Sequence, residues 1–176
     1  MCTLTAIDQT AEACPVAIGG IFALALGDFA DITAATIAGT SVSALTGIVW
    51  SVYLFDKDNT AFFDQNGERP SQFILKYVSD GFCKFVDITD AKIAALEDLG
   101  CCNIVGIAFQ TNGVNRIFGI DPNAAGDEII QSLVGHKITP SAKSGTGEDE
   151  NRIEFVISGE SQTLLTTTID FDTVNA

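Results

Sequence analysis

The side chains of this chain that could do chemistry are its thiols and its single imidazole, and their spacing favours neither catalysis nor metal binding. The thiols belong to Cys2, Cys14, Cys83, Cys101 and Cys102. They form no Cys-x-x-Cys pair, and His136 is the only histidine, so the ligand spacing of a zinc site is missing. A nucleophilic cysteine needs a nearby base. His136 lies in a polar stretch beside Lys137, which predicts an exposed loop residue.

The two adjacent cysteines are poor candidates for a disulfide. Because neighbouring residues of a strand point to opposite faces, Cys101 and Cys102 rarely bridge each other. We predict reduced cysteines that act as small buried hydrophobic residues, in a chain folded in a cytoplasm. An enzyme that uses Cys101 or Cys102 as a thiol nucleophile stays open as a different class of function.

Four acids between positions 56 and 68 resemble a calcium-binding loop at first sight. They are Asp56, Asp58, Asp64 and Glu68. An EF-hand loop needs glycine at its sixth position and glutamate at its twelfth, but counting from Asp56 these positions hold Ala61 and Gly67. The glycines of Ser144–Gly147 also lack the Lys-Ser/Thr of a phosphate loop. We therefore predict no metal, no cofactor and no catalysis.

The composition indicates one domain over residues 1–176, rich in apolar side chains. Hydrophobic residues make up 47% of the chain and charged residues 18%. That suits a subunit that buries much of its outer surface against copies of itself, and a large β-rich core explains it equally. The net charge is −14, from 23 acidic and 9 basic residues. Because nucleic-acid readers neutralise phosphates with Lys and Arg, tight DNA or RNA binding is not expected.

The first 55 residues carry acids but no base. The acids are Asp8, Glu12, Asp28 and Asp31. We predict that some of them face a shared lumen or interface of an assembly. The uncharged span Ile32–Phe55 is long enough for a membrane helix, but its Ser and Thr residues and two glycines make strands the better interpretation. The N-terminus lacks the basic region of a signal peptide, and no membrane partner is expected.

The stretch Asn103–Asp121 predicts a hairpin. Val105, Ile107 and Phe109 alternate with small or polar residues, which is the period of a strand with one buried face. Asn112-Gly113 tolerates the positive φ of a tight turn and is the candidate turn.

One helix is expected just before this hairpin, at Asp90–Leu99. Thr89 is the candidate N-cap and Gly100 the residue that ends the helix. The buried stripe would consist of Ile93, Leu96 and Leu99.

The rest of the chain is predicted as strands between an N-terminal arm, residues 1–17, and a long loop, residues 121–151, where Gly, Pro and acids gather. Strands are expected at Ile21–Leu26, Gly47–Phe55, Thr60–Asp64, Gln72–Val78, Arg152–Ser158 and Thr163–Asp170. With the hairpin this makes roughly eight to ten strands and one helix. We predict a mainly β fold, a β-sandwich or barrel with one flanking α-helix.

Four stretches, taken together in their order, carry a resemblance to a known family. They are Cys14–Ile21 with Gly27–Ile32, Thr60–Glu68, the hairpin Val105–Ile120, and the closing strand Asn151–Ser158 with its turn Gly159–Ser161. This order resembles tail tube-like virion proteins of bacteriophages, of the kind carried by phages of Bacteroidetes. The helix Asp90–Leu99 fits the single flanking helix of that fold, whereas the loop 121–151 departs from a compact version of it.

The resemblance implies a tail tube-like sandwich or barrel that forms rings, commonly hexameric, which stack into a tube for genome ejection. It implies that strands of neighbouring subunits join around the channel, and that the N-terminal arm and loops contact adjacent subunits. The resemblance also implies other phage tail proteins as partners, DNA that passes without tight binding, and a place in the virion tail after assembly in the host cytoplasm. The alternative is a head–tail connector, a capsid decoration or a host-binding module, which copy number per particle would separate from a tube subunit.

Overall fold

The fold is mainly β, as seen in a computed structural model of the chain. The described residues are 21–55, 60–71, 74–85, 94, 97–98, 100, 102–110, 114–132, 134–143 and 152–175. Eleven of their strands form one open, mixed sheet, and the short helix α2 (Phe171–Val174) lies near the C-terminus. The expected N-terminal arm lies outside the described residues.

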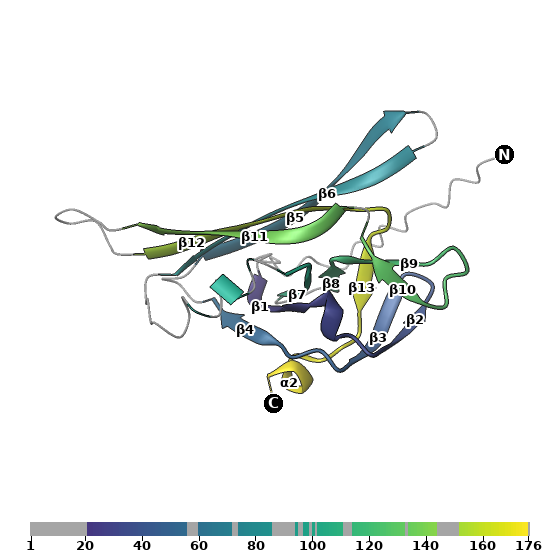
Figure 1. Ribbon diagram of the computed structural model, residues 1–176, viewed down its shortest axis with the longest axis horizontal. Helices are drawn as coiled ribbons and strands as arrows, with labels where there is room; N and C mark the ends of the chain where they lie inside the picture. The colour runs from purple at the N-terminus through teal and green to yellow at the C-terminus, as the bar shows by residue number, and fades with distance from the viewer. Residues whose placement is uncertain are drawn as a thin grey trace, which may run out of the picture.

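The strands lie in two layers, one above the other (Figure 1). The lower one, termed the short-strand layer, has the order β2-β3-β13-β8-β7-β1-β4. Its strands are β2 (Ala34–Ala38), β3 (Ser41–Thr46), β13 (Leu165–Thr167), β8 (Asn115–Phe118), β7 (Ile104–Gln110), β1 (Ile21–Asp28) and β4 (Ser51–Leu54). Only β13 and β3 pair in parallel; the other described pairs are antiparallel.

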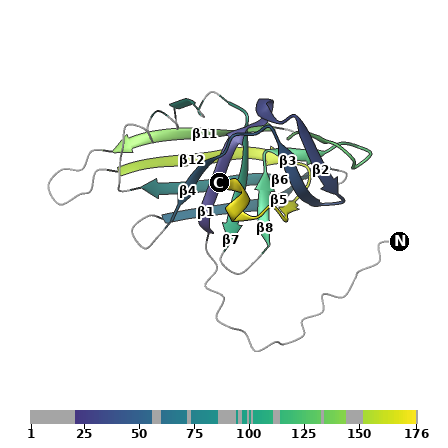
Figure 2. The same cartoon turned by 90° about the horizontal axis from the view of Figure 1, so that it is seen from below.

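The upper layer, termed the long-strand layer, has the order β11-β12-β6-β5, and all its pairs are antiparallel. Its strands are β11 (Val134–Lys143), β12 (Arg152–Ser161), β6 (Ile74–Phe85) and β5 (Thr60–Ser71). A single residue pair, His136 with Ile104, joins this layer to β7. Seen from below, β1, β7 and β8 run across the direction of β11 and β12 (Figure 2).

A small two-stranded sheet of β9 (Ile120–Pro122) and β10 (Ile129–Gln131) completes the strands. It follows β8 directly in the chain, after Gly119, whose φ of +91° places it in the left-handed region that favours glycine.

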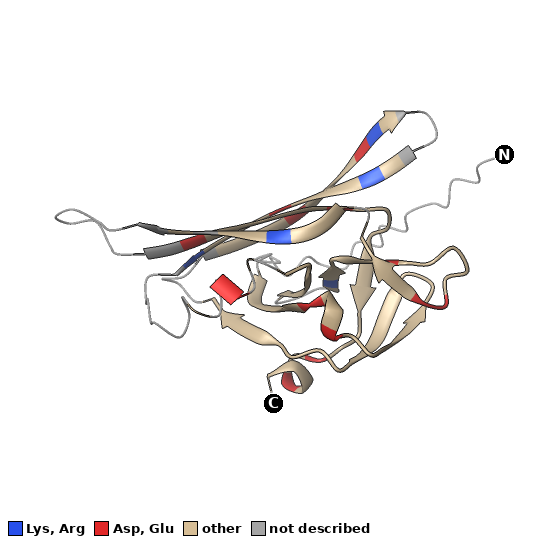
Figure 3. Ribbon diagram, viewed as in Figure 1, with Lys and Arg blue, Asp and Glu red and all other residues tan. Residues whose placement is uncertain are grey.

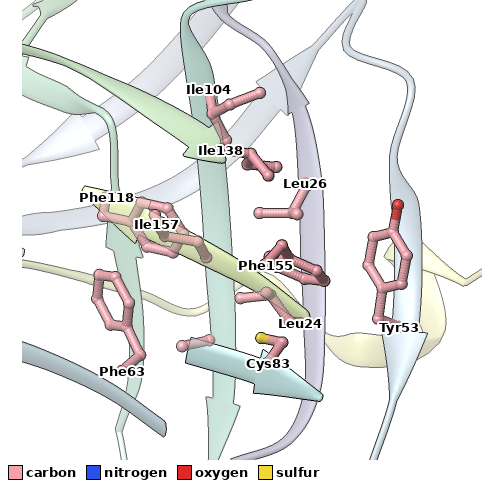
Figure 4. Close-up of a cluster of buried hydrophobic side chains, with 11 residues drawn as sticks. Leu24, Leu26, Tyr53, Phe63, Cys83, Ile104, Phe118, Ile138, Phe155 and Ile157 are labelled. Carbon is pink, nitrogen blue, oxygen red and sulfur yellow. The ribbon is translucent and has the colours of Figure 1, made fainter. Parts of the chain in front are cut away.

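The main core lies between the two layers (Figure 4). Its buried members are Leu24, Leu26, Tyr53, Phe63, Cys83, Ile104, Ala108, Phe118, Ile138, Phe155 and Ile157. The rings of Phe63 and Phe118 stack across the layers with centroids 4.2 Å apart. Burying a side chain of this size stabilises the fold by about 1.5–3 kcal/mol, so these contacts hold the layers together.

A second core lies on the far face of the short-strand layer. Its buried members are Ala23, Ala25, Val42, Val105, Ile107, Phe109, Ile117, Ile120, Leu165, Ile169 and Val174. Along β1, Leu24 and Leu26 enter the main core while Ala23 and Ala25 enter the second one. β1 and β7 therefore have apolar neighbours on both faces.

The predicted hairpin is present, but its burial was predicted wrongly. β7 and β8 pair antiparallel, with Ile107 opposite Ile117. Residues Ile104 to Phe109 are all buried, so β7 does not have one buried and one exposed face. The small side chains that looked solvent-facing, such as Gly106 and Ala108, face the main core, where the Phe118 ring occupies the space a Cβ of Gly106 would need. Asn112 and Gly113 lie outside the described residues.

The predicted helix Asp90–Leu99 lies mostly outside the described residues. Its described members, Ala94, Glu97 and Asp98, are helical. Gly100 is helical as well, so it continues the helix instead of ending it as predicted.

The loop predicted over residues 121–151 is wrong for its central part, because β10 and β11 lie there. β11 pairs with β12 along its length, from Val134 opposite Glu160 to Lys143 opposite Arg152. Pro140 lies inside this strand, opposite Phe155. Proline is tolerated in edge strands, where its missing N–H faces no ladder partner.

Residues 65–68, which lie between the expected strands Thr60–Asp64 and Gln72–Val78, also belong to a strand. These residues continue β5, which extends to Ser71, and β6 begins at Ile74. The resulting hairpin projects past the end of β12, whose Ser161 lies opposite Tyr77 (Figure 1).

Candidate functional site: the long-strand layer

Two of the four acids predicted to face a lumen or an interface lie among the described residues, at the end of β1. Asp28 Oδ1 accepts a hydrogen bond from the backbone N–H of Ala30 at 3.0 Å and caps the 3-10 helix η1 (Phe29–Asp31). Asp31 is exposed in that helix. The structure thus brings Asp28 and Asp31 into one turn of the short-strand layer and gives Asp28 a local capping role. Asp8 and Glu12 lie outside the described residues.

His136, predicted as an exposed loop residue, is instead fully buried on β11. The pairing of β11 with β12 shifts register between Val134 and Lys137, and this irregularity turns the imidazole inward. The ring lies 5.4 Å from the ring of Phe118, and its Nε2 is 2.7 Å from Ser79 Oγ on β6. Burial lowers the pKa of His136 from 6.5 to about 4, so the imidazole is neutral at physiological pH.

A hydrogen-bonded serine and histidine are two members of a hydrolytic site, but this pair is enclosed. Ser79 is 2% exposed and His136 has no exposed surface, so a substrate cannot reach either atom unless the strands around them separate. The His136 Nδ1 has no hydrogen-bond partner among the described residues, so no carboxylate orients the ring as in a catalytic triad. The arrangement fits a structural role.

The described thiols are also enclosed or hydrogen-bonded. Cys83 is buried in the main core, and burial raises the pKa of its thiol, which keeps it protonated. Cys102 is partly buried, and its Sγ donates to the Asp98 carbonyl at 3.3 Å. Across the described part of the chain, no three His, Cys, Asp or Glu side chains gather as metal ligands do. Cys2, Cys14 and Cys101 lie outside it.

Asp121 is a buried acid that sequence reasoning placed only at the end of a strand. Its carboxylate accepts hydrogen bonds from the backbone N–H groups of Gln162, at 2.9 and 3.0 Å, and Thr163, at 2.9 Å. Asp121 therefore holds the turn that follows β12 against strand β9. The signal that could have found it is an acid directly before Pro122, in an otherwise apolar strand.

The outer face of the long-strand layer, which points away from the main core, carries an apolar row. Phe62 on β5 lies opposite Phe82 on β6, and Phe82 lies opposite Val156 on β12. The two phenyl rings stack at 6.0 Å between centroids. Phe62 is 45% exposed and Val156 is 41% exposed. The row is therefore an exposed apolar feature of the outer face.

A charged row runs next to the apolar one. Asp64 lies opposite Asp80, Asp80 opposite Ser158, and Ser158 opposite Lys137. All four side chains are exposed. The row is thus acidic at the β5 side of the layer and basic at the β11 side.

The projecting end of β5–β6 carries two ion pairs between described residues. Lys76 Nζ lies 2.7 Å from Glu160 Oε1 and 3.6 Å from Glu68 Oε2. Figure 3 shows acidic and basic segments close together along this end of the hairpin. The hydrogen bond to Glu160 and the nearby carboxylates raise the pKa of Lys76. The Glu68 side chain is 57% exposed, and ion pairs at the surface add little stability.

Both margins of the long-strand layer are open edges. Within the described residues β5 pairs with β6 alone, and β11 pairs with β12 on one side and only through His136 on the other. A groove of about 230 Å³ borders β5, lined by Ile21, Ala61, Phe62, Phe63, Asp64, Gln110 and Arg116. The unpaired backbone groups of such an edge are a template for another strand.

The layer, with its two open edges and its apolar and charged rows, is the candidate functional site. No helix among the described residues is long and apolar enough to span a bilayer. No family model, curated protein or solved structure matches the chain.

Proposed function

We propose that the chain is a non-catalytic virion structural protein, a subunit of a phage tail tube whose stacked rings form a channel for genome ejection. The observation that carries the proposal is a pair of edges on opposite margins of one four-stranded layer. Among the described residues, β5 pairs with β6 alone, and the outer edge of β11 pairs only at His136, with Ile104 of β7. An open edge on each side lets copies join head to tail, and a head-to-tail contact that closes forms a ring.

The strand directions support closure. Because β11, β12, β6 and β5 alternate in direction, a second copy that places its β11 beside β5 continues the alternation. Every added copy repeats the same antiparallel contact, and the closed ring leaves no edge unpaired. An odd number of strands in the layer would have required a parallel contact at each joint.

The finer fold type belongs to this proposal as well. Two layers that pack face to face across the main core support a tail tube-like sandwich or barrel. In a ring closed through the long-strand layer, the short-strand layer covers one face and the row of Phe62, Phe82 and Val156 lines the other.

The charge is consistent with a channel for DNA. The net charge is −14, and exposed acids such as Asp64 and Asp80 lie on the face that would line the channel. Acidic walls repel phosphates, so DNA passes without tight binding. The partners are then further copies of the chain and other tail proteins, and the location is the virion tail.

The test is electron microscopy of the purified protein together with its mass in solution over a range of concentrations. We expect rings or tubes in equilibrium with monomers. Protein that stays monomeric at every concentration, and particles without such rings, would refute the proposal. Counting copies per particle separates the tube, which has many rings, from the alternative head–tail connector, which has one ring, and from a capsid decoration or host-binding module.

A further inference from the structure

The outer face of the long-strand layer presents apolar side chains to solvent. Phe62 and Val156 are 45% and 41% exposed, and the ring of Phe82 lies between them in the same row. A hollow of about 410 Å³ borders this row, and its lining includes Val78 and Val134. Figure 1 shows the short-strand layer on the opposite side of these strands. An exposed apolar patch of this kind marks an interaction surface.

The charges next to the apolar row are arranged in one direction across the layer. Asp64 on β5 and Asp80 on β6 occupy one half of their row, whereas Ser158 on β12 and Lys137 on β11 occupy the other half. No ion pair joins Asp64, Asp80 or Lys137 to another side chain in the described part of the protein. The row therefore has an acidic half and a basic end, each without a counter-charge.

A second copy placed face to face with the first meets both requirements. A two-fold axis that runs parallel to the strands, above the line between β6 and β12, lays β5 of one copy over β11 of the other and β6 over β12. Each row then faces the same row of the second copy. Asp64 faces Lys137 and Phe82 faces Val156, and each contact occurs twice because the axis is two-fold. Sheets aligned in this way pack about 10 Å apart with interdigitated side chains.

The charges select this axis over the other face-to-face arrangement. A two-fold axis that runs across the strands would lay β5 over β5 and β11 over β11. Acids would then lie over acids and Lys137 over Lys137, which is unfavourable. The axis parallel to the strands avoids this. It also leaves the backbone pairing of His136 with Ile104 intact, because only the face of β11 is used and not its edge.

We propose that the outer face of the long-strand layer docks on the same face of a second copy. The two-fold dimer is held by the row of Phe62, Phe82 and Val156 and by two ion pairs between Asp64 and Lys137. A two-fold contact closes at two copies. The dimer covers the face that lines the channel of the proposed ring, so dimer and ring exclude each other. It is thus a state of the chain before assembly, in addition to the monomer, and it does not depend on the ring.

The mass in solution tests the dimer at concentrations below those at which rings form. We expect the wild type to change from the mass of one chain to that of two as its concentration rises. Val156→Asp places a charge in the apolar contact, and Lys137→Glu turns two attractions into two repulsions. Each variant should raise the dissociation constant of the dimer at least about tenfold. Circular dichroism confirms that the variants fold.

A charge swap identifies the contact. Asp64→Lys combined with Lys137→Glu restores both ion pairs with reversed sign, so the dissociation constant should return to within a few-fold of the wild type. The matched control is Asp172→Lys combined with Lys137→Glu, which has the same net charge. Asp172 is exposed on α2, beyond the short-strand layer (Figure 1), so this control should stay as weak as Lys137→Glu alone.

The outcomes for the dimer and for the ring are separate. A wild type that keeps the mass of one chain up to the concentration at which rings form would overturn the dimer and leave the ring in place. Equal rescue by the Asp64 and Asp172 variants would also overturn it, because the effect would then come from net charge alone. Dimers without rings at any concentration would support the dimer and count against the ring.

Discussion

His136 Nε2 lies 2.7 Å from Ser79 Oγ, and the contact passes over Gly159, which belongs to the strand between them. The imidazole can cross β12 only because that position has no side chain. The contact ties β11, which has few other neighbours, to the centre of the layer. His136 thus makes two different contacts. Its side chain bonds to Ser79 within the long-strand layer, and its backbone pairs with Ile104 of the short-strand layer.

The buried imidazole should make the fold sensitive to acid. Its pKa is lowered from 6.5 to about 4, so the unfolded chain binds a proton more readily than the folded chain. Stability is fully present above pH 6.5 and is lost as the pH falls from 6.5 to about 4, by about 3 kcal/mol for this group. Urea unfolding at pH 7.5, 5.5 and 4.5 measures the loss.

The matched variant for this measurement is His136→Gln, whose amide can bond Ser79 but does not titrate. Its free energy of unfolding should fall less steeply over the same pH range, since the carboxylates of the chain titrate in both proteins. Parallel curves for the two proteins would show that His136 is not the source of the acid sensitivity.

Gly159→Ala should destabilise the protein through a clash with the imidazole. A Cβ at this position would lie 2.5 Å from His136 Cγ, and overpacking of this kind costs about 1–3 kcal/mol. Thermal unfolding gives the effect. Gly67→Ala, on β5 of the same layer, is the control, because its Cβ would make an ordinary 3.4 Å contact with Tyr77.

A double-mutant cycle identifies the cause. In a His136→Ala background, Gly159→Ala should lose most of its effect, since the ring that it meets is gone. An equal loss of stability in both backgrounds would mean that Gly159 is needed for its backbone conformation and not to make room for the His136 ring.

The candidate turn of the β7–β8 hairpin should need residues that tolerate positive φ. Asn112→Val or Gly113→Val should lower the melting temperature and weaken assembly, because a β-branched residue resists that conformation. Val114→Thr, next to the turn and exposed, is the control. If both valine variants melt and assemble as the wild type does, the turn is built differently.

The thiols should differ in their reaction with an alkylating reagent. Cys83 should stay unmodified in the folded protein and react only in denaturant, because it is buried and its raised pKa suppresses the thiolate. Peptide mapping by mass spectrometry after timed alkylation gives the rate at each cysteine. Rapid modification of Cys101 or Cys102 in folded protein would revive the thiol enzyme, and slow modification of all five would remove it.

Hydrophobic runs were sufficient to predict the mainly β class and the positions of β1, β7 and β12. The projecting part of β5–β6 was missed because residues such as Asn66, Gly67 and Glu68 have solvent on both faces. A strand with no buried face shows no alternation of apolar and polar residues, so its sequence does not predict a strand. The projecting part of β5 is a strand because it pairs with β6, and a pattern within one segment does not reveal such pairing.

The candidate site was mostly beyond sequence reasoning. β11 contains His136, Lys137 and Pro140, a composition typical of loops, and its strand state comes from pairing with β12. The burial of His136 requires a register shift in β11 and a glycine on a different strand, Gly159. The free edges likewise follow from strand order, which the sequence alone leaves undetermined.

The two-sided burial of β1 and β7 changes what the hydrophobicity of the chain means. Strands that are enclosed on both faces need apolar side chains at every position. A domain with two cores therefore contains many more apolar residues than a domain with one core. Almost half of the residues of the chain are hydrophobic, and many of them are buried in the two cores of a single copy. Apolar composition is therefore weak evidence for self-association in this protein, and the case for a ring has to be made at the rims of its sheet.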